Sequence, residues 1–321
     1  MQLAGAASVP ASVARPSPVR RRRFRVGAGP VEAWIYVLPA LALFALFELY
    51  PIFANIVASL HGGHGPLSID QFSIDQYRTA AADPVFWVAV RNSLVWVVLS
   101  VAAEIAIGFP LALLIELYIG RGRPLFRTIL FLPMVVTPSV IALVFTTIYA
   151  PDYGLLFGLF NWLGLAGSFP ALLGSPFWAT PTLISVNVWQ WCGFFVLLYC
   201  VGIAGLDREL LDAAAIDGAT GFARIRYVIW PLLRSTHVSL IVLGTIQALQ
   251  QFPLIYLMTE GGPANQSQTL ATFIFQTGFV ENRMGYASAI AVVLFVLALV
   301  LVAVEYWLAG GGLPIGEQRR A

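Results

Sequence analysis

The amino-acid sequence predicts an all-α membrane protein with six spanning helices. Hydrophobic residues make up 59% of its 321 residues and the mean hydropathy is +0.82, whereas soluble domains are about 45–50% apolar. Only 11% of the residues are charged. Six apolar runs approach or exceed the roughly 20 residues that a helix needs to cross the hydrocarbon core of a bilayer.

The six expected spans follow one another along the chain. They are residues 34–60, 85–118, 128–150, 177–205, 236–258 and 286–308. Several contain Pro and Gly, which spanning helices tolerate when neighbouring helices satisfy the freed backbone groups. A further apolar stretch, residues 155–173, is interrupted by glycines and by Pro170. We expect it to lie at the outer membrane surface, because a seventh span would move the Arg-rich segment after Gly205 outside.

The basic residues predict the orientation of the spans. All 18 are arginines, and all but Arg78, Arg91 and Arg283 fall in segments that are cytoplasmic when the N-terminus is inside. This asymmetry is the positive-inside pattern, so both termini are expected in the cytoplasm. Residues 1–30 are interpreted as a disordered basic cytoplasmic tail, with a transit peptide as the alternative. Residues 31–308 form the predicted six-helix transmembrane domain, and residues 309–321 a second cytoplasmic tail.

The sequence excludes several kinds of catalytic or metal site. A P-loop needs a Lys to reach the phosphates, and the chain contains no Lys. His61 and His64 supply only two ligands, which is an incomplete metal site. Cys192 and Cys200 are eight residues apart on one expected helix, about 12 Å along its axis, too far for a disulfide. We therefore expect a chain without enzymatic activity, metal or cofactor of its own.

One polar segment, residues 209–231, lies between the fourth and fifth expected spans. Asp207 can cap a helix that begins at Arg208, and Glu209 suits the positive end of its dipole. Three alanines, residues 213–215, give that helix a smooth face that another protein could approach closely. Gly218 can adopt a positive φ and turn the chain into a second short helix, residues 222–229. An ordinary amphipathic interhelical loop is the alternative interpretation.

This segment resembles the cytoplasmic EAA loop of ATP-binding-cassette (ABC) importer permeases. Counted from Asp212, Gly218 and Pro231 fall on the positions of Gly and Pro in that motif. Asp212 stands where Glu is usual, and Val228 and Trp230 stand where Ile and Leu are usual.

The resemblance extends over most of the chain, from about residue 34 to residue 308. Residues 252–264 are similar to a signature of carbohydrate-type permeases, with Glu260 in place of a frequent Gly. The start of the last expected helix, residues 285–289, also matches the family. Further matching positions are Tyr50, Pro51, Asn92, Trp189 and Gly193.

Several expectations follow from this resemblance. It implies the type I ABC importer permease fold and a multi-pass protein of the bacterial inner membrane. It implies a polar loop, residues 205–235, that docks on a separate cytoplasmic ATPase dimer, which binds ATP and Mg. The implied partners also include a second homologous permease, an external solute-binding protein and membrane lipids, but no nucleic acid. The docking residues are expected to be Glu209, Asp212, Ala213, Ala214, Asp217, Gly218 and Pro231.

Amide side chains inside the spans are candidates for a path that carries sugar. Polar groups at membrane depth normally face the helix bundle or a water-filled cavity, and amides both donate and accept hydrogen bonds. Nearby aromatic rings at Trp189, Trp191 and Phe194 could stack on a sugar ring. Interhelical hydrogen bonding is the alternative role, worth about 0.6 kcal/mol per bond on average in membranes. The expected path residues are Asn187, Gln190, Gln247, Gln250, Gln251 and Tyr256, and the three fifth-span glutamines share one helical face.

Glu104, in the second expected span, has three possible roles. It could pair with a partner subunit, be protonated or line the path, and a structural role is favoured. Glu48 and Glu116 lie near span ends, where they could reach the interface. The sequence does not identify the solute. A sugar is preferred because no Arg lies deep in a span; glycerol-3-phosphate or another polyol-type solute is the alternative. An ion-coupled secondary transporter is a remote one, since it would need coupling acids and internal repeats.

Overall fold

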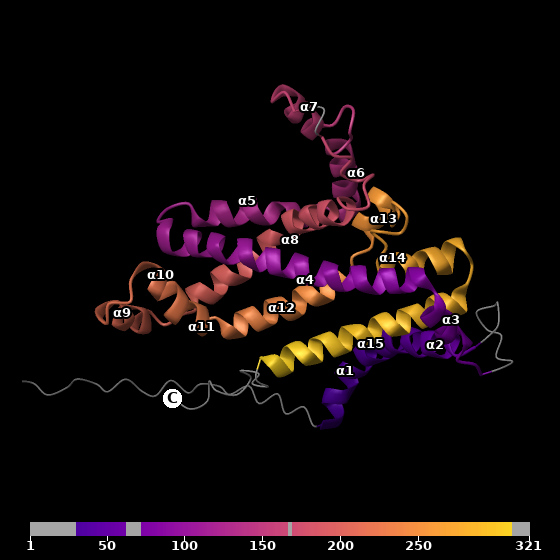
Figure 1. The fold of residues 1–321 in the computed structure, drawn as a ribbon. Coiled ribbons are helices and arrows are strands. Elements are labelled where there is room, and N and C mark those ends of the chain that lie inside the picture. The colour runs from indigo at the N-terminus through magenta and orange to yellow at the C-terminus, as the bar shows by residue number, and fades with distance from the viewer. Residues whose placement is uncertain (1–29, 62–71, 166–168, 310–321) are drawn as a thin grey trace, which may run out of the picture. The chain divides into compact units, whose positions relative to one another are not determined.

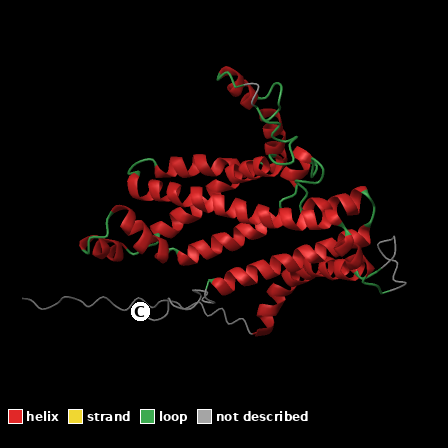
Figure 2. Cartoon of the chain, viewed as in Figure 1, coloured by secondary structure: helices red, strands yellow, loops and turns green. Residues whose placement is uncertain are grey.

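The computed structural model describes residues 30–61, 72–165 and 169–309, with the side chains of residues 30–33 excepted. Within these ranges the regular structure is helical (Figure 2), and one isolated β-bridge joins His61 and Phe72. The expected tail at residues 1–30 lies almost entirely outside the described residues, as does nearly all of the tail at 309–321 and His64 of the possible metal pair.

The chain divides into two units, Met1–Pro51 and Ile52–Ala321. The described part of the first unit consists of helix α1 (Pro30–Phe44) and the π-helical turn η1 (Ala45–Leu49), followed by the start of α2 (Tyr50–Ser59). The second unit contains every later helix. It also contains the polar loop and the candidate path residues.

Among the described residues, four helical stretches are long and apolar enough to cross a membrane. They are Trp34–Ser59, Pro84–Tyr118, Ala179–Ala204 and Met284–Leu308. Two bent helix pairs raise the number to six if each pair is one span. The protein is therefore helical and multi-pass, with four to six candidate spans in the part of the chain that the structure describes. The expected count of six stays a prediction, as does the location of the termini.

The third expected span is not one continuous helix. It divides into α5 (Arg123–Val135) and α6 (Pro138–Ile148), whose axes differ by 91°. Thr137 is extended, with φ −61° and ψ 140°, because the ring of a following proline disfavours helical geometry in the preceding residue. Hydropathy alone does not detect this break, since both sides of it are apolar.

The fifth expected span is also interrupted. Helix α12 (Arg234–Leu249) ends before Gln250, and α13 (Pro253–Thr259) begins three residues later. Phe252 precedes Pro253 and leaves the helical region, with φ −122° and ψ −54°. The prediction that all three glutamines lie on one helix is therefore wrong, because Gln250 and Gln251 both follow the last residue of α12.

The second unit also contains helices outside the polar loop. They are α3 (Asp75–Ala82), α4 (Pro84–Leu113) with turn η2 (Leu114–Tyr118), α7 (Leu155–Trp162), α8 (Ala179–Ala204), α14 (Leu270–Phe275) with turn η5 (Gln276–Val280), and α15 (Met284–Leu308). Helix α7 has 8 residues, which is well short of the roughly 20 required for a span. This agrees with the expectation that residues 155–173 do not cross the membrane.

Helices α4, α8 and α12 pack against one another, and α5 packs on α8 (Figure 1). The approach of α5 to α8 depends on Gly193, where an added Cβ would lie only 1.9 Å from the carbonyl oxygen of Leu130. Phe195 of α8 fits between two further glycines, since a Cβ at Gly108 of α4 or at Gly244 of α12 would each lie 2.9 Å from an atom of its side chain. Small residues permit this close packing of helix backbones in membranes.

Candidate functional site

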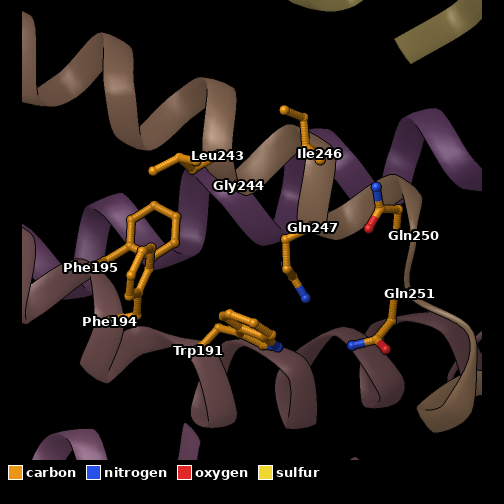
Figure 3. A pocket seen from close by; sticks show the side chains of 9 residues that line it. All are labelled: Trp191, Phe194, Phe195, Leu243, Gly244, Ile246, Gln247, Gln250 and Gln251. Carbon is orange, nitrogen blue, oxygen red and sulfur yellow. The ribbon is translucent and has the colours of Figure 1, made fainter. Parts of the chain in front are cut away.

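A pocket of about 380 Å³ lies between α8 and the second half of α12. Its wall combines aromatic rings, aliphatic groups and three amides. In Figure 3, the side chains of Gln247 and Gln251 extend toward α8, whereas Gln250 stays near the end of α12. The lining residues are Trp191, Phe194, Phe195, Leu243, Gly244, Ile246, Gln247, Gln250 and Gln251.

Buried Asn187 holds two of these glutamines in place. Its Oδ1 accepts from Gln251 Nε2 at 2.6 Å and from Gln247 Nε2 at 3.2 Å. Its Nδ2 donates to Glu104 Oε1 at 3.1 Å. The four side chains form one chain of hydrogen bonds that joins α4, α8 and the end of α12.

The structure places Glu104 within this chain of hydrogen bonds and away from the pocket wall. Its side chain is fully buried, and within the described residues its second carboxyl oxygen has no hydrogen-bond partner. Because Asn187 can direct Oδ1 at the glutamines only while its amide group keeps this orientation, Glu104 positions the pocket amides indirectly. This geometry fits the structural role favoured from the sequence.

The other predicted path residues lie elsewhere. Gln190 is buried outside the pocket and donates from Nε2 to the carbonyl oxygen of Val136 at 3.1 Å. Val136 ends α5 at its bend, so Gln190 satisfies a carbonyl near the break. Tyr256 is not among the pocket-lining residues; its ring stacks on Phe252 and meets the edge of Phe275.

The signature segment at residues 252–264 leads into a tightly hydrogen-bonded turn. Asn92 of α4 donates to the carbonyl oxygens of Gln266 at 2.8 Å and Gln268 at 2.9 Å. Gly261 has φ +84°, and an added Cβ would lie 1.5 Å from Gln268 Oε1. This position therefore requires glycine for two independent reasons.

The polar loop begins with the expected capped helix. Helix α9 spans Arg208–Ile216, and the Asp207 side chain accepts from the backbone N–H of Glu209 at 2.9 Å. Leu211 anchors α9 in the core, while Ile216 is 87% exposed. Gly218 has φ +84° with open space around it, so it makes the expected turn. Of the predicted docking residues, Ala214 is half-buried, and Glu209, Asp212, Ala213, Asp217, Gly218 and Pro231 are exposed.

The second arm of the loop differs from the expected helix at residues 222–229. It consists of α10 (Gly221–Arg224), the π-helical turn η4 (Ile225–Ile229) and α11 (Trp230–Leu232). Phe222 and Tyr227 are largely exposed, whereas Ile229 is fully buried. The arm therefore exposes aromatic side chains to the surface, while Ile229 packs in the hydrophobic core.

Glu116, near the end of the second expected span, is paired with two arginines. It is buried and forms ion pairs with Arg127 and, at 3.7 Å, with Arg123. A polar pocket of about 270 Å³ beside this group also includes Arg208, Asp212 and Arg224. No cluster of three or more potential metal ligands occurs among the residues that the structure describes.

Comparison with known proteins assigns the family. Residues 105–310 match the family described as the binding-protein-dependent transport system inner membrane component. The chain belongs to this family. The permease is 34% identical to the probable ABC transporter permease protein YurN of Bacillus subtilis, over 86% of this chain and 95% of that protein. It is 30% identical to the lactose transport system permease protein LacF of Rhizobium radiobacter, over 87% and 94%.

A solved structure supports the same fold. The permease superposes on a chain from the crystal structure of a bacterial alginate ABC transporter in complex with an alginate pentasaccharide-bound periplasmic protein. The TM-score is 0.77 at 25% identity, and the match covers 87% of this chain and 93% of that chain. The resemblance inferred from the polar loop and the signature segment is therefore confirmed.

Sequence reasoning missed two polar contacts of the permease. Thr245 Oγ1 of α12 donates to Glu305 Oε1 in the last turn of α15 at 2.6 Å. The imidazole of His237 contacts Tyr199 and the Trp230 carbonyl. A lone His in an apolar run, six residues after a Trp-Pro pair, was the available signal.

Proposed function

We propose that this permease forms half of the translocation path of an ATP-driven importer for a neutral sugar in the bacterial inner membrane. A second, distinct permease supplies the other half, and an external solute-binding protein delivers the sugar. A cytoplasmic ATPase dimer binds ATP and Mg and docks on the polar loop. The observation that carries the proposal is the pocket between α8 and α12. It combines aromatic rings with amide side chains, and α12 is the helix that directly follows the polar loop.

The chemistry of the pocket suits a sugar. The rings of Trp191 and Phe194 offer apolar faces, and Gln250 and Gln251 offer neutral donors and acceptors for hydroxyl groups. Among the described residues, no Arg lines this pocket, whereas a phosphate ester would favour a cation. This lining supports a sugar over glycerol-3-phosphate. The lactose permease and the alginate transporter among the similar proteins also handle carbohydrates.

The polar loop suits a docking role. Its two arms meet at Gly218, and its exposed apolar side chains include Ile216 and Phe222. Exposed large apolar groups on a short polar loop are typical of an interface. Movement of the docked ATPases would then act on α8 and α12, because these two helices flank the loop and also carry the pocket.

The alternative of an ion-coupled transporter is disfavoured by Glu104. A coupling acid must be reached by the ion from a water-filled path, but Glu104 is fully buried and bonded to Asn187. We therefore assign the driving force to ATP hydrolysis by the partner subunits.

The test compares two loop variants with a matched control in the complete complex. The wild-type complex, reconstituted in proteoliposomes with ATP inside, is assayed for uptake of radiolabelled lactose, maltose and glycerol-3-phosphate delivered by the cognate binding protein. Gly218→Val and Ala214→Trp should abolish uptake while the chain still inserts. Gly120→Val should transport normally, since a Cβ at either glycine meets nothing within 4 Å but only Gly218 has a positive φ. Normal uptake by both loop variants would refute the docking role, and uptake of glycerol-3-phosphate alone would refute the sugar assignment.

A further inference from the structure

Four aromatic side chains meet where the polar loop joins α12, and we call them the aromatic cluster: Phe109, Tyr199, Trp230 and His237. Trp230 belongs to the second arm of the loop, and the other three belong to α4, α8 and α12. The cluster lies at the 68° bend between Gly221–Leu232 and Arg234–Leu249.

The imidazole of His237 is the centre of the cluster. Its ring lies over the Trp230 ring, with 4.0 Å between centroids and 35° between planes. Its Nε2 is 3.2 Å from the Trp230 carbonyl oxygen, and its Nδ1 is 2.7 Å from the Tyr199 hydroxyl. A carbonyl can only accept, so Nε2 carries a proton; in a neutral imidazole Nδ1 then accepts from Tyr199.

Phe109 of α4 packs against the other three rings of the aromatic cluster. Its ring meets Trp230 edge-on at 5.0 Å, Tyr199 at 5.4 Å and His237 at 5.8 Å. Such edge-to-face pairs are favourable beyond their buried area. The last residue before Pro231 is thus held directly by α4 and α12, and Tyr199 of α8 contacts both of the side chains that hold it.

The hydrogen bond between His237 and Tyr199 joins α12 to α8, and these are the two helices that line the pocket; of the two, α12 is hydrogen-bonded to Trp230 through His237. Tyr199 is eight residues from Trp191, about 12 Å along α8, and His237 is ten residues from Gln247, about 15 Å along α12. Between these points Phe195 fits tightly against Gly244 of α12. A displacement of Trp230 therefore moves both walls of the pocket, because closely packed helices have no free space in which to absorb it.

We propose that His237 is a positioning residue that transmits movement of the polar loop to the pocket, acting through Trp230 and Tyr199. This inference rests on the proposed function and specifies which side chains carry its coupling. Without the imidazole, the ATPases would still bind the exposed face of the loop. The second arm would then move without drawing α8 and α12 along.

The experiment measures pocket access in the assembled complex of both permeases and the ATPase dimer, without any solute. Gln250→Cys, in a chain that also carries Cys192→Ala, is labelled with a membrane-impermeant methanethiosulfonate reagent, before and after trapping with ATP and vanadate. The parent without the reporter cysteine gives the background from buried Cys200. Trapping should change the labelling rate by about tenfold, a typical size for allosteric coupling.

His237→Ala should reduce this change to less than about twofold, while the ATPases still copurify and hydrolyse ATP. His237→Gln places an amide N–H near the former Nε2 and should restore most of the response. Leu240→Ala removes a buried contact one turn away and should keep the full response despite lower stability. Tyr199→Phe, which deletes only one hydroxyl, should give a reduced response even if His237→Ala does not fold.

Two results would overturn the proposal: a wild-type response in His237→Ala or Tyr199→Phe, or an equal loss in Leu240→Ala, which would show a general effect of packing. Failure of the proposed function would look different. In that case the parent complex itself would not bind ATPase subunits or would show no change in labelling on trapping.

Discussion

Replacing Asn187 with Leu removes every hydrogen bond that orders the pocket amides while nearly preserving side-chain shape. In the wild-type protein Asn187 accepts from Gln247 and Gln251 and donates to Glu104. Gln247 is half-buried and lines the pocket, so its side chain can turn toward it. Glu104 is fully buried and Gln251 is 5% exposed, so these two groups would be left without a partner.

The structure sets the size of the effect. A buried polar group without a partner costs about 1–3 kcal/mol, which gives about 2–6 kcal/mol for two groups. Interhelical hydrogen bonds in membranes average only about 0.6 kcal/mol, because the altered side chains find new partners, and this sets a lower limit near 1.2 kcal/mol. We expect Asn187→Leu to lower the free energy of unfolding by about 2 kcal/mol.

A double-mutant cycle with Glu104→Met distinguishes this mechanism from simple loss of packing. If the cost arises from an orphaned carboxyl group, removing both partners should recover about 1 kcal/mol relative to the sum of the single variants. The free energies are measured by denaturant titration of the purified chain in mixed micelles. Single-variant effects that add to within about 0.5 kcal/mol would refute the coupling of Asn187 to Glu104.

Three further predictions concern packing, catalysis and the path. Gly193→Ala should prevent recovery of folded protein, since its methyl would lie 1.9 Å from the Leu130 carbonyl oxygen, whereas Gly158→Ala meets nothing within 4 Å and should behave as wild type in size-exclusion chromatography. The purified chain should hydrolyse no ATP until the ATPase subunits are added; turnover by the contaminant-free chain would contradict its role as a permease. Gln250→Ala or Gln251→Ala should lower solute uptake, because losing one hydrogen-bond partner of the solute costs about 1–3 kcal/mol of binding free energy. Copurification of the ATPases should not change, and unchanged uptake in both variants would show that these residues do not belong to the path.

The sequence predicted the apolar segments well but not their continuity. Each apolar run continues past its break, so residues 128–150 and 236–258 were expected to be single helices. The breaks precede Pro138 and Pro253, and the prolines themselves were visible. Many prolines within spans are tolerated, as Pro110 is inside α4, so a proline alone does not determine where a helix stops.

The candidate site was also predictable only in part. Helical spacing placed Gln247 and Gln251 on one side of the chain, and the structure bonds both to Asn187. Contact of these residues with solute stays a prediction. Gln190 was grouped with them for its amide and for its spacing of three residues from Asn187, but the bend between α5 and α6 provides it with the Val136 carbonyl. Partners that arise from a break in a distant helix cannot be inferred from local spacing.

The geometry of Glu104 supports one last prediction, which separates ATP-driven uptake from ion coupling. Glu104→Gln keeps the oxygen that accepts from Asn187 Nδ2 and replaces the carboxyl oxygen that has no partner within the described residues. Because the orientation of Asn187 is then preserved, the pocket amides should stay in place. We expect uptake to fall by no more than a few fold, which corresponds to about 1 kcal/mol for a buried amide NH2 group without a partner.

A coupling acid would behave in the opposite way, because an amide cannot take up and release the transported proton. Uptake of the solute that the cognate binding protein retains is therefore measured in proteoliposomes with ATP inside, with and without a protonophore. Wild type and Glu104→Gln should both be insensitive to the protonophore and dependent on ATP. Loss of uptake in Glu104→Gln, together with protonophore sensitivity of the wild type, would show that Glu104 carries the driving ion and that the pocket belongs to a different class of transporter.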